Sequence, residues 1–241
     1  MDSVAAAGAV PVASPRPDTR ESGRSWLRVG QVSAALLLLS LTSFLILDHP
    51  LSGYLKAHRL KGELTNLFQA AEHFGTPYGA TLILITMWII LPDTRRRVSR
   101  TAVGAITAGL LSNLVKLLVT RLRPGVFDFA EPIQASVIGF FKFGEGGSRH
   151  QSFPSAHTAF AIAFAVLLGD LFPKARIWFL GIGVLVALQR VTTSAHYPSD
   201  VFAGAAVGWV TASIFLGPSA LSRFYDRWED RYFPRSPSSS R

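Results

Sequence analysis

The sequence predicts an all-α membrane protein: a polytopic helical bundle of six transmembrane helices with an outer interfacial helix. Two observations lead to this prediction. The mean hydropathy is +0.32 although the formal net charge is +9, and the apolar residues are concentrated in long runs. A basic protein that binds nucleic acid would be polar throughout, so we expect no nucleic-acid partner. Six apolar runs approach the roughly 20 residues that cross a bilayer core.

These six runs are expected to be helices, because lipid offers no hydrogen-bond partner to an irregular backbone. Small residues recur in the third and sixth runs, which favours close helix packing in lipid. The predicted spans are residues 29–48, 75–92, 101–119, 155–171, 176–190 and 199–216.

The segments outside the spans have distinct compositions. The first 24 residues are rich in Ala, Pro and Ser, which predicts a disordered tail followed by a retained membrane anchor. Residues 52–73 alternate basic and apolar side chains at helical spacing, which indicates an amphipathic helix on the outer interface. The three resulting regions are a tail at 1–24, a six-helix membrane domain at 25–220, and a basic cytoplasmic tail with an interfacial helix at 221–241.

The distribution of Lys and Arg predicts the orientation of the chain. Basic residues are most frequent before the first span, between the second and third, between the fourth and fifth, and after the sixth. Because the richer side faces the cytoplasm, both termini are expected there. The loops at 49–74, 120–154 and 191–198 are then expected on the extracytoplasmic side, periplasmic or luminal.

Polar residues collect at the outer ends of spans three to six. Lys116 lies near the outer end of the third span, where a lone lysine could reach the interface or face the interior of the bundle. Arg123 follows two helical turns later, so we expect both side chains on one helix face. Arg121 points elsewhere on this spacing and is expected to be a surface charge.

The stretch "FPSAHT" begins the fourth span. Pro154 is expected at the first helical position, where its missing N–H has no cost. Ser155 and the N–H of Ala156 then lie at the positive end of the helix, where an anion can bind, although Ser155 alone could be a simple cap. His157, on the next turn, can donate a proton.

The third cluster contains Arg190, His196 and Asp200. Asp200 could cap the sixth helix, but it also follows His196 by four residues and could accept a hydrogen bond from the imidazole. Taken together, the three clusters suit a phosphoryl group: cations and N–H groups neutralise its oxygens, one His attacks phosphorus, and the other protonates the leaving oxygen. The chain has no Cys and no carboxylate cluster for Mg²⁺, so we expect no metal and no cofactor.

The order and spacing of these motifs resemble the type 2 phosphatidic acid phosphatase superfamily, which contains integral-membrane lipid phosphatases and soluble vanadium-dependent haloperoxidases. The resemblance lies in three stretches: Lys-x6-Arg-Pro from Lys116 to Pro124, Pro-Ser-Ala-His at 154–157, and Arg-x5-His-x3-Asp at Arg190, His196 and Asp200. The second stretch departs from the usual Pro-Ser-Gly-His at Ala156, and Gln189 stands where the third motif often has Ser.

The resemblance implies a metal-independent hydrolysis of a lipid phosphate monoester or diphosphate. His196 would be the nucleophile that forms a phosphohistidine, Asp200 would orient it, and His157 would be the general acid and then the base. The residues implied to bind the phosphate are Lys116, Arg123, Ser155, Ala156 and Arg190. The candidate substrates are phosphatidic acid, phosphatidylglycerol phosphate, polyprenyl diphosphate and a phosphorylated glycolipid such as lipid A.

Two other functions remain open on the sequence. A lipid phosphotransferase would use the same intermediate, and a non-catalytic binder or transporter would only hold an anionic headgroup. The outer loop 125–153 is a candidate lid or membrane anchor, because its phenylalanines precede a run of glycines; these residues are Phe140, Phe141, Phe143, Gly144, Gly146 and Gly147. The sequence carries no signal for an oligomeric state.

Overall fold

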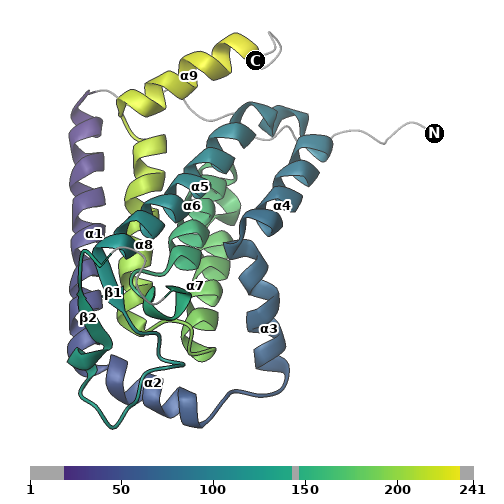
Figure 1. Ribbon diagram of the computed structural model, residues 1–241. Coiled ribbons are helices and arrows are strands. Elements are labelled where there is room, and N and C mark those ends of the chain that lie inside the picture. Colours follow the sequence, from purple (N-terminus) through teal and green to yellow (C-terminus); the bar gives the residue numbers. More distant parts are fainter. Residues whose placement is uncertain (1–18, 143–146, 234–241) are drawn as a thin grey trace.

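The computed structural model describes residues 19–142 and 147–233, with side chains from residue 25 onward, and this part of the chain is mostly helical. Long helices form a bundle, with α2 and a small hairpin at one end and α9 at the other (Figure 1). The helices are α1 (Thr19–Ile46), α2 (Asp48–Ala57), α3 (Glu63–Glu72), α4 (Pro77–Ile90), α5 (Arg95–Leu118), α6 (Ala156–Leu171), α7 (Arg176–Thr192), α8 (Pro198–Leu216) and α9 (Ala220–Tyr232). Short 3₁₀ turns are His73–Gly75, Pro92–Thr94, Ile133–Ser136, Gly147–His150 and Pro173–Ala175.

Long apolar helices confirm that this is an integral membrane protein of the predicted kind. Within the described residues, four helices are long and apolar enough to cross a membrane: Ser25–Ile46, Pro92–Leu118, Pro173–Thr192 and Pro198–Leu216. The second and fourth predicted spans are also apolar helices, but α4 and α6 have 14 and 16 residues. Because roughly 20 residues span a bilayer core, the count of six spans stays a prediction.

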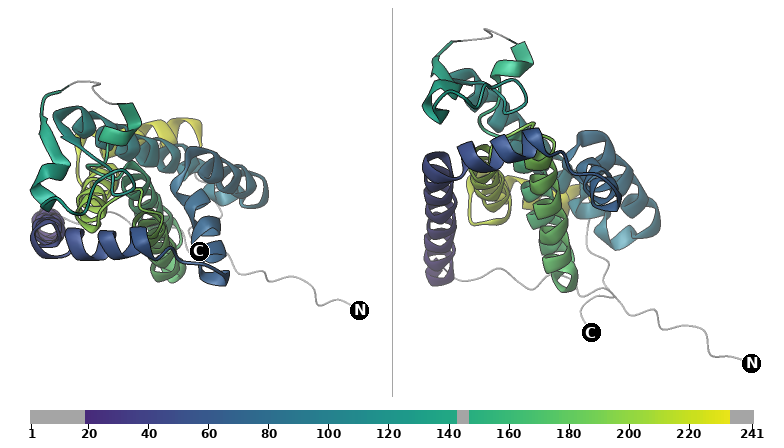
Figure 2. Two further views of the ribbon diagram at one scale, coloured as in Figure 1. Left: turned by 60° about the horizontal axis from the view of Figure 1, so that its bottom comes forward. Right: turned by 90° about the horizontal axis from the view of Figure 1, so that it is seen from below.

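The prediction of one amphipathic helix over residues 52–73 is wrong, because the chain forms two helices there. Helix α2 ends at Ala57, and Gly62, with a φ of 82°, precedes α3. Glycine adopts this left-handed conformation at little cost, so the chain turns at this point. Helix α2 lies across the end of the bundle, whereas α3 runs along its side and meets α4 at a bend of 73° (Figures 1 and 2).

The start of the chain also differs from its prediction. Helix α1 begins at Thr19, inside the tail that was expected to be disordered, and residues 1–18 lie outside the described part. At the other end, the predicted interfacial segment forms α9, whose Phe224 and Tyr232 are exposed. Helix α9 packs against α5 and α8, so it is attached to the bundle.

A two-stranded sheet interrupts the all-α architecture. Strands β1 (Val119–Arg121) and β2 (Val137–Phe140) pair antiparallel, with Val119 opposite Phe140 and Thr120 opposite Gly139. Two consecutive β-branched residues favour strand over helix at this point. The helix of the third span therefore ends at Leu118, which changes the direction of every side chain that follows it.

Helix α6 lies at the centre of the bundle and packs against α5, α7 and α8. Its alanines at 159, 161, 163 and 165 are fully buried. A Cβ added at Gly204 of α8 would lie 2.4 Å from the carbonyl oxygen of Ser155, and one at Gly208 would lie 2.3 Å from that of Ala159. The small residues of α8 thus allow close packing, and they bring the start of α8 against the start of α6.

Candidate functional site

His196 lies in the loop between α7 and α8 and is almost completely buried. Its Nδ1 lies 2.7 Å from the carbonyl oxygen of Ser152. A carbonyl oxygen can only accept, so Nδ1 carries the proton and Nε2 keeps its lone pair. The expected hydrogen bond to Asp200 is not formed, because Nδ1 and Oδ2 of Asp200 are 3.7 Å apart. Asp200 is instead a nearby negative charge.

Ser152 connects His196 to Asp200, a role that no sequence pattern indicated. Its hydroxyl donates to Oδ2 of Asp200 at 2.5 Å, while its carbonyl accepts from His196. Its backbone N–H donates to the carbonyl of Arg121 at 3.1 Å. The residue is fully buried, so these three bonds fix the imidazole and the carboxylate relative to each other.

Asp200 has a full set of hydrogen-bond donors. Besides Ser152, the backbone N–H of Tyr197 donates to Oδ2 at 2.9 Å and Nη1 of Arg121 donates to Oδ1 at 2.6 Å. The bond from Tyr197 is part of a capping box, so the simpler expectation of a helix cap is also correct. Asp200 therefore caps α8 and supports His196 from one position.

Arg121 was expected to be a surface charge, and this prediction is wrong. Its side chain is only 2% exposed and bridges two carboxylates, with Asp48 at 2.8 Å and Asp200 at 2.6 Å. Its guanidinium also donates to Ser199 at 2.7 Å and lies 3.9 Å from the ring centre of Tyr197. Since α5 ends at Leu118, Arg121 belongs to β1 and helical spacing does not give its direction. Asp48, a second residue that sequence reasoning missed, also accepts from the N–H of Ser199 at 3.0 Å.

The cations at 116 and 123 occupy different elements. Lys116 lies in the last turn of α5 and its Nζ donates to the carbonyl of Gln151 at 3.0 Å. Arg123 lies beyond β1, so the prediction that the two share one helix face is wrong. Burial, and then the charge of Arg190, lower the pKa of Arg123, and its Nε is buried without a hydrogen-bond partner among the described residues. The two arginines therefore lie near each other and repel.

The side chain of Arg190 contacts a carboxylate, Glu72, that no sequence pattern indicated. Its Nη1 forms a very short ion pair with Oε1 of Glu72, the last residue of α3. The amide of Gln189 donates to the other oxygen of Glu72 at 2.7 Å. The Nε of Arg190 is buried and lacks a partner within the described chain. Arg190 thus has one carboxylate contact and unused hydrogen-bonding capacity.

The start of α6 forms a cap as predicted, but the helix begins two residues later in the chain than expected. Helix α6 begins at Ala156, so Ser155 is the N-cap and Pro154 precedes it, whereas Pro154 was expected at the first helical position. The Ser155 hydroxyl accepts from N and Oγ1 of Thr158 at 3.4 and 3.0 Å, and the Ser155 N–H donates to the Asp200 carbonyl at 3.0 Å. The N–H of Ala156 has no partner in the helix, as at any helix start.

The charges that act on the two histidines come from all three sequence clusters, so these clusters lie close together. Burial, together with the charges of Lys116 and Arg123, lowers the pKa of His196 to about 4, although Asp200 opposes this shift. The imidazole of His157 is close enough to Arg190 and His196 for their charges to act on it. At neutral pH His196 is therefore an uncharged base among cations, an arrangement able to attack an anionic phosphoryl group.

The outer loop carries exposed apolar side chains, and its role as a lid or membrane anchor stays a prediction. Phe140 and Phe141 are 65% and 66% exposed, and the carbonyl of Arg149 accepts from the N–H of Arg123 at 2.9 Å. The remaining phenylalanine and two of the glycines of the candidate lid, Phe143, Gly144 and Gly146, lie outside the described residues. The exposed phenylalanines place apolar surface beside the loop that supplies Arg123.

Known proteins with similar sequences are named as lipid phosphatases. The chain is 38% identical over 117 residues to lipid A 1-phosphatase of Rhizobium johnstonii, covering 46% of this chain and 44% of that protein. It is 33% identical over 148 residues to decaprenylphosphoryl-5-phosphoribose phosphatase of Mycobacterium tuberculosis, covering 59% and 73%. The chain thus spans about half the length of the lipid A 1-phosphatases that it matches.

Comparison with solved structures supports the fold. The crystal structure of LpxE from Aquifex aeolicus is similar with a TM-score of 0.54 and 22% identity, covering 70% of this chain and 94% of that one. Residues 97–218, half of the chain, match the family model of the PAP2 superfamily. This segment includes all three clusters of the candidate site. The protein therefore belongs to the PAP2 superfamily.

Proposed function

We propose that the protein is an integral-membrane lipid phosphatase that works through a phosphohistidine at His196. One observation carries this proposal: Nδ1 of His196 donates to the Ser152 carbonyl, so Nε2 is an unprotonated nucleophile. A site that only bound a headgroup would need cations but no buried neutral imidazole. The names of the relatives, all of them lipid phosphatases in the cases above, support the same reaction class.

In the first step Nε2 of His196 attacks phosphorus and the bond from phosphorus to the lipid oxygen breaks. His157 donates a proton to that oxygen, which leaves as the lipid alcohol or the lipid monophosphate. The nearby carboxylate of Asp200 stabilises the positive charge that develops on the imidazole. In the second step water attacks the phosphohistidine, His157 accepts the proton, and inorganic phosphate and free His196 are released.

The phosphate oxygens are bound by the cations and the helix start. Lys116, Arg123 and Arg190 supply the positive charge, and Ser155 and the N–H of Ala156 supply donors at the positive end of α6. Because the protein's own cations neutralise the charge of the transition state, we propose that turnover requires no metal ion and no cofactor. Phosphate binding then competes with Glu72 for Arg190.

The proposed membrane arrangement keeps six spans, formed by α1, α4, α5, α6, α7 and α8. Helix α4 crosses together with the bent segment α3, and α6 is surrounded by other helices, so its 16 residues need not match the bilayer alone. The Arg-rich start of α5 and the three arginines of α9 face the cytoplasm together with both termini. The candidate site then opens on the extracytoplasmic side, and residues 25–220 carry the phosphatase domain.

The proposed substrate is the phosphate group of a membrane lipid. A phosphorylated glycolipid resembling lipid A comes first, because lipid A 1-phosphatases are among the relatives with the highest identity. The exposed Phe140 and Phe141 offer apolar surface for the lipid chains near the cationic site.

Phosphate release from a panel of lipids tests this function. The panel contains lipid A, phosphatidic acid, phosphatidylglycerol phosphate and a polyprenyl diphosphate, each assayed with and without EDTA. We expect release from at least one lipid, unaffected by EDTA and inhibited by vanadate, and at least about 10⁴-fold less release by His196→Ala. His58→Ala, an exposed histidine at the end of α2, is the matched control and should retain activity.

Several results would contradict the proposal. Full activity of His196→Ala would exclude this nucleophile, and strong inhibition by EDTA would indicate a metal mechanism. Labelled phosphate that appears in a second lipid instead of in solution would identify a phosphotransferase. Lipid binding without any turnover, measured for the whole panel, would identify a headgroup binder or transporter.

A further inference from the structure

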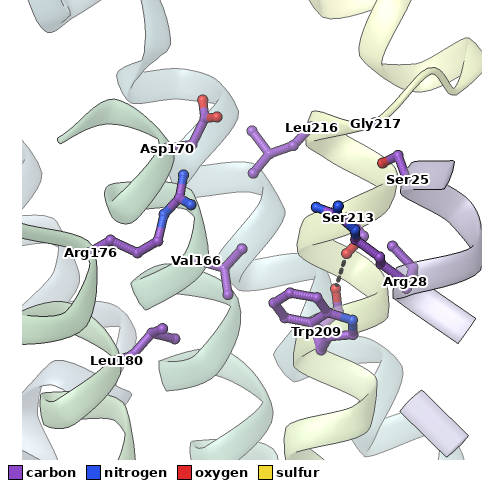
Figure 3. A pocket seen from close by; sticks show the side chains of 11 residues that line it. Ser25, Arg28, Val166, Asp170, Arg176, Leu180, Trp209, Ser213, Leu216 and Gly217 are labelled. Carbon is purple, nitrogen blue, oxygen red and sulfur yellow. Dashed lines mark hydrogen bonds between the residues drawn. The ribbon is translucent and has the colours of Figure 1, made fainter. Parts of the chain in front are cut away.

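A cavity of about 490 Å³ lies at the end of the bundle opposite the candidate site. Figure 3 shows the side chains that line it. It is formed by the start of α1, the end of α6, the start of α7 and the end of α8. The candidate site uses the other ends of α6, α7 and α8, and none of its residues lines this cavity. We name this space the α1–α7 groove, and its volume lies within the range of small-molecule sites.

Two cations line opposite walls of the α1–α7 groove. Arg28 of α1 and Arg176 of α7 extend from either side toward the space between them (Figure 3). Within the described part of the chain, neither arginine forms an ion pair. The acidic residue of the lining, Asp170, is engaged by Nη1 of Arg97 at 2.5 Å. The groove therefore has an excess of positive charge.

The rest of the lining is suited to an amphiphile. Val166 and Leu180 provide apolar walls from α6 and α7, on the membrane side of the two arginines along their helices. The indole Nε1 of Trp209 is buried and has no hydrogen-bond partner among the described residues. A buried donor without a partner is costly, and an oxygen of a bound ligand would satisfy it. The groove thus offers charge at one end and apolar surface with a free donor below it.

We propose that the α1–α7 groove binds the headgroup of an anionic phospholipid. The phosphate lies between Arg28 and Arg176, an ester oxygen reaches Trp209, and the acyl chains follow the apolar wall. The surroundings support a lipid rather than a soluble anion, because three of the four helices that form the groove, α1, α7 and α8, are long and apolar enough to span the membrane. Basic pockets between membrane helices are typical sites for anionic headgroups.

This lipid belongs to the leaflet opposite the substrate. The groove lies at the end of the molecule where α1 and α7 begin, whereas the proposed catalytic residues lie at the end where α7 finishes and α8 begins. The groove is therefore a second lipid site, separate from the phosphatase site. Its occupancy does not depend on the proposed catalytic function, and its test does not measure phosphate release.

Fluorescence quenching by brominated lipids tests the proposal. Purified protein in mixed micelles is titrated with phosphatidylglycerol brominated on its acyl chains, and separately with brominated phosphatidylcholine. The chain has five Trp, so Trp209→Phe identifies the signal of the groove. We expect half-maximal quenching of Trp209 at a roughly 10- to 30-fold lower mole fraction of phosphatidylglycerol, because two basic side chains contact the anionic lipid.

The variant Arg28→Gln/Arg176→Gln should abolish this preference. Its matched control is Arg227→Gln/Arg231→Gln, which removes the same charge from exposed positions of α9 and should keep the preference. If the double variant is not recovered folded, Arg176→Gln alone should reduce the preference by roughly half on a logarithmic scale. Equal quenching by both lipids, an unchanged preference in the groove variants, an equal loss in the control, or a signal that survives in Trp209→Phe would overturn the proposal.

Discussion

Buried arginines stabilise both ends of the bundle, and a comparison of the two ends separates a structural network from a candidate site. At the α9 end, Arg100 is 2% exposed and binds Glu229 at 2.7 Å and Asp226 at 2.6 Å. At the other end, Arg121 is equally buried and binds Asp48 and Asp200. Arg100 joins α5 to two carboxylates of α9, whereas Arg121 joins β1 to the starts of α2 and α8, so each arginine fixes distant elements against one another.

Apart from Arg28 and Arg176 of the α1–α7 groove, the ends differ in the cations next to these networks. At the α9 end, Arg96 binds Glu229 and Asp230, and Arg97 binds Asp170. At the other end, Lys116 and Arg123 have no carboxylate partner in the described part of the chain, and Arg190 shares Glu72 with Gln189. A buried charge without a partner is expensive, so positive charge left over in a folded protein indicates a place for an anion.

The largest effect is expected from the two buried arginines. Arg121→Met leaves Asp48 and Asp200 without their cation, which should lower the free energy of unfolding by about 3–5 kcal/mol and abolish phosphate release. Arg100→Met should destabilise the fold to a similar degree but leave the folded fraction active, since its network does not reach the site. Thermal unfolding in detergent and activity per folded molecule measure both effects. Activity in Arg121→Met equal to that in Arg100→Met would remove the distinction between the ends.

A second, smaller effect is expected at Ser152. Ser152→Ala removes the hydroxyl that donates to Asp200 at 2.5 Å, so the carboxylate and the imidazole lose their alignment. Since small misplacements reduce rates by up to about 100-fold, kcat should fall roughly 10- to 100-fold with KM nearly unchanged. Ser222→Ala at the α9 end is the matched control, because Ser222 is buried and its hydroxyl has no partner among the described residues. An increase in KM at constant kcat would indicate a role in binding and contradict alignment.

The third expectation concerns pH. The pKa of His196 is lowered to about 4, so the free imidazole stays neutral, and nucleophilic, well below the usual value of about 6.5. As the pH falls, protonation of His196 should therefore lower kcat/KM only near pH 4. The substrate phosphate also titrates, so the profile is first corrected for its pKa, measured by ³¹P NMR. An acid limb near pH 6.5 would show that His196 is not held in its buried neutral form.

The smallest effect is expected at Glu72, the carboxylate that Arg190 holds at the site end. Glu72→Gln keeps a hydrogen-bond acceptor for Gln189 but removes the charge that competes with phosphate for Arg190. KM should fall a few-fold, about the effect of 1 kcal/mol, while kcat changes little. Steady-state kinetics measure this, with Glu131→Gln in the outer loop as the control for loss of one carboxylate. A higher KM would show that Glu72 positions Arg190 and does not compete with substrate.

The sequence predicted the proximity of the polar clusters better than their contacts. Lys116, Arg123, Ser155, Arg190 and His196 were proposed as site residues from motif spacing, and the structure brings their clusters close together. Their geometry was partly wrong, because Lys116 and Arg123 were placed on one helix and α5 ends at Leu118. Helical spacing is reliable only while the helix continues, and here the chain leaves the helix to pair with β2.

The residues that escaped prediction share one property: each acts on partners distant in sequence. Asp48 binds Arg121 across 73 positions and Ser199 across 151. Ser152 binds His196 across 44 positions, and Glu72 binds Gln189 across 117. No local pattern marks an isolated acidic residue or serine as part of a site, because its neighbours in sequence are not its neighbours in space.

By itself, the sequence determined that this is a membrane bundle with three polar clusters at one end of its helices. Local chemistry suffices for that, because apolar length sets where a chain can enter lipid and helix starts set where anions can bind. Only the tertiary structure decided which imidazole nitrogen is free, which arginine is structural, and which cations remain available. Those properties depend on which atoms meet across the packed bundle, and packing is set by all helices together rather than by any one segment.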